Sequence, residues 1–215
     1  MSTAYDPPRD PLVILHADAD LLVVDKPSGL LSVPGKGADL ADCLLARLDA
    51  AYPGTLLVHR LDRDTSGVMV FARRKSAQRH LGLQFERRHT EKRYIALVAG
   101  QPDADAGTVA LPLIADWPNR PRQMVDVDRG KPAVTHWRVL ERYAGSARLE
   151  LRPETGRSHQ LRVHLAEIGH PILGDPLYST GAAAQSPRLM LHAEMLSLRH
   201  PDGGARVGFS ATCPF

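Results

Sequence analysis

The feature that most constrains the fold is a succession of short apolar runs that end at tight turns. Strands are predicted at residues 12–15, 21–25, 30–35, 67–74, 92–100, 108–114, 133–143, 147–153 and 188–200. Residues 144–146 form a hairpin turn between two of these runs. Because strands outnumber helices and short turns join many of them, we expect an α+β fold. It has a mixed, mostly antiparallel sheet flanked by a few helices, not a doubly wound parallel sheet.

Three segments show the spacing of helices. Asp39 caps the first, whose apolar face carries Leu40, Leu44, Leu45 and Leu48. Residues 77–85 form a second helix, and residues 159–169 form a third that ends at Gly169. No repeat or low-complexity linker divides the chain, so residues 1–215 are predicted to form one domain.

Bulk properties exclude several classes of protein. No apolar run approaches the roughly 18 residues of a membrane span, and residues 1–11 lack the pattern of a signal peptide, so we expect a cytoplasmic protein without a membrane partner. The two cysteines lack the spacing of metal ligands, as do the histidines. A net charge of +3 and a pI near 9.0 permit a nucleic-acid partner without requiring one.

The stretch HRLDRDTSG at residues 59–67 concentrates charge beside small side chains. Arginines on either side of Asp62 keep a carboxylate ionised, and Thr65, Ser66 and Gly67 leave room for a bulky group to approach. An ionised, positioned aspartate serves as a nucleophile or a general base. The alternative is a capped turn between two strands, in which Asp and Thr satisfy the backbone.

Two other segments carry side chains suited to chemistry. ETGRSHQLRVH at 154–164 gathers Arg157, His159 and Arg162 at a helix start, which suits recognition of phosphates or bases; a solvated helix edge is the alternative. Tyr94 lies within an apolar strand, where its hydroxyl needs a partner, and a buried structural tyrosine is the other interpretation.

Four motifs in this order, HRLDRDTSG, KRYIALV, TGRSHQLRVH and GHPILGD, resemble the RluA family of pseudouridine synthases. KPSGLLSVPG at 26–35 and LPLIADWPNRPRQ at 111–123 extend the resemblance over nearly the whole chain. It is similar to the shorter members, in which no S4-type RNA-binding module precedes the catalytic domain. One departure is the charged pair Arg63-Asp64, which we do not expect to affect the chemistry.

The resemblance implies roles for individual residues. Asp62 matches the catalytic nucleophile, Tyr94 the tyrosine that contacts the base and shuttles a proton, and Arg162 the arginine that pairs with the catalytic carboxylate. Arg60 matches a residue that holds or replaces the extruded base, and Leu191 an apolar residue that packs beside the uracil.

The implied reaction is isomerisation of uridine to pseudouridine in RNA. It breaks the N1–C1′ bond, rotates the uracil and joins C5 to C1′, so it needs no redox cofactor and no metal. The base must leave its stack, at a cost of roughly a few kcal/mol. The implied partners are a tRNA anticodon stem-loop and 23S rRNA, bound by a monomer. The phosphates would meet the basic side chains of Arg60, Arg120, Arg122 and Arg157.

Three rival functions are weaker. An aspartyl-phosphate phosphatase would use Asp62 and Asp64, but the threonine follows one position too early and the acidic pair for magnesium is missing. A non-catalytic RNA-binding module has no need for a small-residue pocket beside an aspartate, and aromatic residues for stacking make up only 5% of the chain. A Ser–His–Asp hydrolase fails because the adjacent Ser158 and His159 cannot form that relay.

Overall fold

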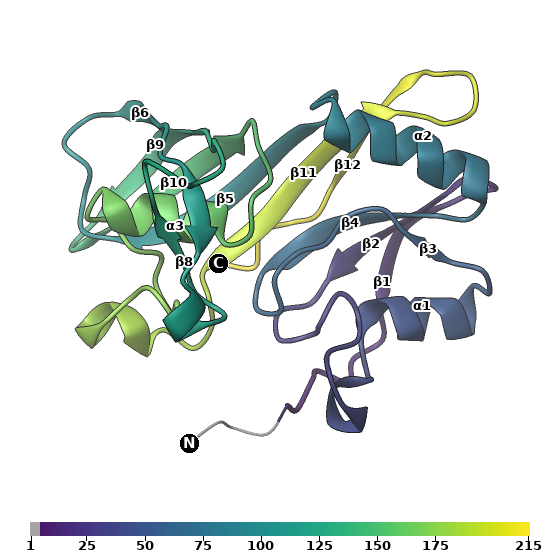
Figure 1. Ribbon diagram of the computed structural model, residues 1–215, viewed down its shortest axis with the longest axis horizontal. Coiled ribbons are helices and arrows are strands. Elements are labelled where there is room, and N and C mark those ends of the chain that lie inside the picture. Colours follow the sequence, from purple (N-terminus) through teal and green to yellow (C-terminus); the bar gives the residue numbers. More distant parts are fainter. Residues whose placement is uncertain (1–4) are drawn as a thin grey trace. The chain divides into compact units, whose positions relative to one another are not determined.

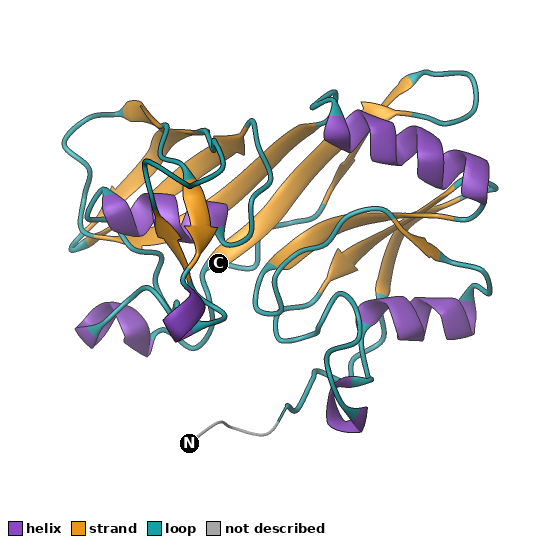
Figure 2. Ribbon diagram, viewed as in Figure 1, coloured by secondary structure: helices purple, strands orange, loops and turns teal. Residues whose placement is uncertain are grey.

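The computed structural model describes residues 5–215. The first four residues of the segment 1–11, for which no signal peptide is predicted, lie outside this range. Within the described residues, three α-helices accompany twelve short strands, and every strand pairing with a printed register is antiparallel (Figures 1 and 2). The predicted α+β class is therefore confirmed. The residues form two compact units, Met1–Lys92 with Ala193–Pro214 and Arg93–His192 with Phe215, which are described in turn.

The first unit contains a sheet in the order β1-β2-β4-β11-β12, with β3 also paired to β4. Its strands are β1 (Val13–Ala17), β2 (Leu21–Lys26), β3 (Leu56–Leu57), β4 (Ser66–Ala72), most of β11 (Leu191–Arg199) and β12 (Arg206–Ser210). Its helices are the 3-10 turn η1 (Ala38–Leu40), α1 (Leu44–Ala51) and α2 (Lys75–Glu86).

Strand β4 is the centre of this unit, because all seven of its residues are buried. Val68 and Val70 pack with Leu81 of α2, while Met69 and Phe71 point to the opposite face by the two-residue alternation of a strand. Figure 1 shows α2 on one side of these strands and α1 on the other. Burial on both faces, worth about 1.5–3 kcal/mol for each large side chain, makes β4 a firm support for the loop that precedes it.

Gly67, the second residue of β4, lies at a point where only glycine fits. Its φ is +114°, and a Cβ there would lie 2.2 Å from the carbonyl oxygen of Ala193. A side chain is therefore excluded by both backbone conformation and contact.

The second unit contains an antiparallel sheet in the order β5-β10-β9-β6 and a separate hairpin, β7-β8. Its strands are β5 (Glu91–Ala99), β6 (Ala106–Val109), β7 (Leu113–Ala115), β8 (Gln123–Val125), β9 (Thr135–Tyr143) and β10 (Ser146–Pro153). Its helices are η2 (Trp117–Asn119), α3 (Gln160–Glu167) and η3 (Gly181–Gln185).

The two faces of the second sheet differ. Leu149 and Leu151 of β10 pack with Leu161 and Leu165 of α3 in one apolar cluster. The hairpin joins this side through Leu113, which packs with Val163 of α3. Alternation places Arg138 of β9 and Glu150 and Arg152 of β10 on the face away from α3.

Most predicted elements are confirmed, and three predictions are wrong. Residues 30–35 form no strand; the first helix begins at Leu44, with Asp39 in η1; and residues 108–114 hold parts of two strands separated by Pro112. The first segment is irregular because its backbone groups bond with Tyr5 Oη and with the backbone of Leu40, Leu44 and Leu45 instead of a neighbouring strand. Its Ser32 hydroxyl bonds with the backbone of Leu61.

Candidate active site

The loop that carries Asp62 is held by its backbone. All five carbonyl oxygens of residues 61–65 accept a hydrogen bond. Ser32 Oγ donates to Leu61 at 2.6 Å and Ser28 Oγ donates to Asp64 at 2.7 Å. The amide of Thr65 closes a turn on the Asp62 carbonyl at 3.2 Å. A loop fixed in this way presents its side chains in one arrangement, as a catalytic group requires.

Lys26 is the central donor in this network. Its side chain is fully buried, and Nζ donates to the carbonyls of Pro27, Arg63 and Thr65, each at 2.8 Å. Three acceptors match the three N–H bonds of an ammonium group, so these bonds compensate for its burial. Sequence reasoning assigned no role to Lys26; its only signal was the KPSG motif of the family resemblance.

The two aspartates of the loop differ in their surroundings. Asp64 forms an ion pair with Arg63, with Nε and Nη2 at 2.8 and 3.0 Å from the two carboxylate oxygens. Asp62, the first residue of the turn that the Thr65 amide closes, is half-buried, and Arg60 is exposed. Arg63 and Asp64, the charged pair that departs from the family pattern, thus form an ion pair with each other.

His59 anchors the start of the same segment. Its Nε2 accepts the Val70 amide at 3.1 Å, and its ring stacks on Phe85 of α2 at 4.5 Å between centroids. Desolvation, with a smaller contribution from the charge of Lys92, lowers the pKa of His59 to about 3. A neutral ring is therefore built into the support of β4.

In the second unit, Arg162 of α3 is locked to Asp175. Both side chains are buried, and Nε and Nη2 each lie 2.7 Å from a different oxygen of the carboxylate. The amides of Leu177 and Tyr178 also donate to Asp175. A bidentate pair of this kind fixes the plane of the guanidinium. Asp175 was missed by sequence reasoning, although it ends the GHPILGD motif.

Tyr178 connects several predicted residues. Its ring lies 5.1 Å from the guanidinium of Arg162 and 5.2 Å from that of Arg122, and its hydroxyl is 2.7 Å from His159 Nδ1. The hydroxyl also accepts the amide of Gln123 at 2.7 Å. His159 and Arg162 therefore both contact Tyr178, although His159 is the N-cap of α3, with a left-handed backbone, and not one of its helical residues.

The start of α3 is fixed by buried polar groups, so a solvated helix edge is excluded. Gln160 binds Thr155, Thr135 and the backbone, and His164 lies between Thr135 Oγ1 and the Leu111 carbonyl. Burial lowers the pKa of His164. His164 is thus structural, while Arg157 lies outside this core and donates to the Pro132 carbonyl at 3.1 Å.

The remaining predicted residues occupy the second unit or the exposed tip of its hairpin. Tyr94 is half-buried in β5, opposite Leu151, and packs against the apolar cluster of the α3 face. Leu191 is buried in the same cluster. Arg120 and Arg122 are exposed beside η2. The second unit therefore brings Tyr94, Arg162 and Leu191 to the α3 side of its sheet, while Arg60 and Asp62 belong to the first unit.

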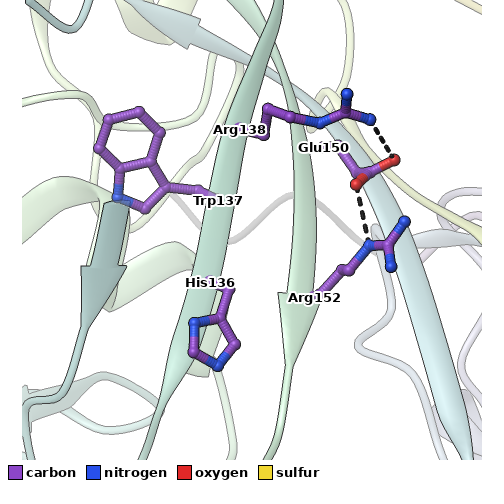
Figure 3. A pocket seen from close by; sticks show the side chains of 5 residues that line it. All are labelled: His136, Trp137, Arg138, Glu150 and Arg152. Atoms are coloured by element: carbon purple, nitrogen blue, oxygen red, sulfur yellow. Dashed lines mark hydrogen bonds and ion pairs between the residues drawn. The ribbon is translucent and has the colours of Figure 1, made fainter. Parts of the chain in front are cut away.

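A shallow hollow of about 260 Å³ lies elsewhere, on strands β9 and β10. It is lined by His136, Trp137, Arg138, Glu150 and Arg152, and Figure 3 shows Glu150 bridging the two arginines. The Glu150 oxygens lie 3.3 Å from Arg138 Nη2 and 2.9 Å from Arg152 Nε. None of the predicted catalytic residues lines this hollow.

Within residues 5–215, no group of three or more His, Cys, Asp or Glu side chains is arranged to hold a metal ion. No helix in this part of the chain is long and apolar enough to cross a bilayer.

Comparisons with known proteins agree with this geometry. The family model for RNA pseudouridylate synthase matches residues 20–167. The chain is 52% identical over 214 residues to the dual-specificity RNA pseudouridine synthase RluA of Escherichia coli K12, covering 98% of each protein. It is 50% identical to the enzyme of that name from Pasteurella multocida, covering 99% of this chain and 98% of that protein. The solved structure of human RNA pseudouridylate synthase domain containing 1 matches with a TM-score of 0.79 and 30% identity, covering 95% of this chain and 84% of the human one.

Proposed function

The chain belongs to the RNA pseudouridylate synthase family and is an RNA pseudouridine synthase, and we propose that it modifies a uridine in a tRNA anticodon stem-loop and another in 23S rRNA. Support for two substrates comes from near full-length similarity to enzymes named dual-specificity synthases. RNA loops favour this chemistry because an unpaired uridine leaves its stack at the lowest cost.

Asp62 is proposed as the nucleophile or base that starts the reaction. The observation that supports this assignment is that all five carbonyls of residues 61–65 accept hydrogen bonds. These bonds hold the backbone from which the Asp62 side chain extends. The reaction cleaves N1–C1′, either by attack of Asp62 on C1′ or through a glycal formed by loss of the 2′ hydrogen. The uracil then turns and C5 bonds to C1′, which displaces the Asp62 carboxylate on the first route and is accompanied by return of the 2′ hydrogen on the second. C5 loses its proton and N1 gains one, so substrate and product remain isomers.

Arg162 and Tyr94 are proposed to complete the catalytic group. Asp175 engages Arg162 through Nε and Nη2, which orients the guanidinium for pairing with the catalytic carboxylate. Tyr94 would take part in proton transfer at C2′ or C5. Leu191 would pack beside the uracil, and Arg60 would hold or replace the extruded base.

The proposed RNA contacts are basic. Arg120, Arg122 and Arg157 would bind phosphates, and His159 would help to recognise phosphate or base at the start of α3. We propose further that the protein acts in the cytoplasm as a single-domain monomer and without a membrane partner, in keeping with an RNA substrate.

Pseudouridine mapping of tRNA and 23S rRNA tests the substrate proposal. Cells that lack the protein are compared with cells complemented by the wild-type chain or by Asp62→Asn. We expect one site in each RNA to lose pseudouridine in the deletion, and only the wild-type chain to restore it. Loss of no site in either RNA would contradict the proposed substrates.

A further inference from the structure

The β7–β8 hairpin exposes apolar side chains to an unusual degree. Six large hydrophobic residues are exposed among those that the structure describes. Two of them, Trp117 and Met124, lie in this hairpin, and a third, Val127, lies two residues after it, in the segment of residues 113–129. Trp117 is 65% exposed, although tryptophan normally buries most of its surface. Concentrated exposure of this kind marks a binding surface better than scattered single residues do.

Two arginines of the same hairpin each lie over an aromatic ring. The guanidinium of Arg120 stacks on the Trp117 ring at 4.1 Å, and that of Arg122 lies over Tyr178. In residues 5–215 neither of these two arginines forms an ion pair, whereas Arg129 in the same segment is paired with Asp126. An aromatic ring with an adjacent free cation suits a ligand that has both a flat ring and a negative charge.

The tip of the hairpin that carries Trp117 is also held in place by hydrogen bonds within the protein. Asp116 receives two bonds from the Asn119 amide side chain and its own amide donates to the Arg122 carbonyl at 3.0 Å. The Gln123 amide donates to Tyr178, the residue that lies beside Arg162. A rigid tip loses little conformational freedom when it binds a partner.

We propose that Trp117, backed by Arg120, is a stacking site for one unpaired base of the substrate RNA. This inference rests on the proposed function, since it assumes that the RNA is a loop substrate. The indole would take the base on its open side, while Arg120 would contribute charge toward the phosphates. The site would then favour RNA loops that have a second unpaired base available for stacking, in addition to the uridine that is modified.

A double-mutant cycle between protein and RNA tests this stacking. Binding of an anticodon stem-loop RNA, and of copies that each lack one loop base, is measured for wild type, Trp117→Ala and Trp117→Phe. Trp117→Ala should raise the Kd about tenfold, as expected for one stacked base, and Trp117→Phe should stay within about threefold. At one loop position, base removal should weaken wild type about tenfold but Trp117→Ala less than about twofold.

Two controls separate stacking from other effects. Leu83→Ala removes another exposed apolar side chain, from α2, and should leave the Kd unchanged. The slope of log Kd against log salt should be the same for Trp117→Ala and wild type, because no cation is removed. A Trp117→Ala protein that binds as tightly as wild type, or equal penalties for base removal at every position, would overturn the inference.

Pseudouridine formation in the same stem-loop distinguishes the two proposals. If wild type forms pseudouridine and Trp117→Ala shows no binding defect, only the stacking site is refuted. If the cycle shows coupling to Trp117 but no pseudouridine forms in this RNA, the anticodon stem-loop is refuted as a substrate and the stacking site stands.

Discussion

Replacing Lys26 with methionine should destabilise the protein and lower kcat while leaving its RNA affinity close to that of wild type. Methionine keeps most of the length of the side chain but removes the ammonium group. The carbonyls of Pro27, Arg63 and Thr65 would each lose a 2.8 Å hydrogen bond inside the protein. Two of these carbonyls, those of Arg63 and Thr65, follow Asp62 in its loop, so the loss is concentrated on the loop proposed to act on the uridine.

The magnitude follows from the number of bonds. A hydrogen bond to a charged group contributes about 1.5–3 kcal/mol net, so three give roughly 4.5–9 kcal/mol. Methionine also removes the cost of burying an ammonium group, which is several kcal/mol. We therefore expect the free energy of unfolding to fall by about 3 kcal/mol, and Tm to fall by about 6–12 °C in a chain of this size. A loop displaced by about 1 Å would lower kcat about 100-fold.

Urea denaturation and single-turnover pseudouridine formation at saturating RNA measure the two effects. Lys36→Met is the matched control, because Lys36 is an exposed residue of the neighbouring loop. RNA affinity should be close to wild type for both variants, since Lys26 is fully buried. A Lys26→Met protein with wild-type stability and wild-type kcat would refute the role given to this side chain. Reduced stability with unchanged kcat would refute the link between the loop's hydrogen bonds and catalysis.

Two further predictions concern buried charge and pH. Asp175→Asn should lower the free energy of unfolding by about 3 kcal/mol in urea, because it leaves the guanidinium of Arg162 buried without its carboxylate; a change below about 1 kcal/mol would contradict this. The surface variant Asp42→Asn, at an exposed pair with Arg47, should match wild type. Because the pKa of His59 is lowered from 6.5 to about 3, its stabilising contribution is complete above pH 6.5 and is lost as the pH falls toward 3. Wild type should then lose up to about 1 kcal/mol per pH unit more than His59→Gln between pH 6 and 4, and equal slopes would show that the ring is not held neutral.

The strands were predictable because each is a short apolar or alternating run that ends near a turn. The same local pattern misled at residues 30–35, where an apolar run binds the Asp62 loop through Ser32. At 108–114 a single predicted strand is interrupted by Pro112, which lacks an amide hydrogen for pairing.

The support of the candidate site was not predictable in the same way, because its contacts join distant residues. Lys26 and Thr65 are 39 residues apart, and Arg162 and Asp175 are 13 apart. Neither spacing belongs to a helix or a strand pattern. Sequence motifs pointed to the right segments, but only the fold showed that Lys26 holds a loop and that Asp175 holds an arginine.

Single-turnover assay of Asp62→Asn tests the central claim most directly. Asparagine keeps the size of the side chain and removes the negative charge, so stem-loop RNA should bind with nearly wild-type Kd. Pseudouridine formation in that RNA should be abolished, because neither attack on C1′ nor removal of a proton is available to the amide. Turnover at the wild-type rate would contradict the account and would require another residue to begin the reaction.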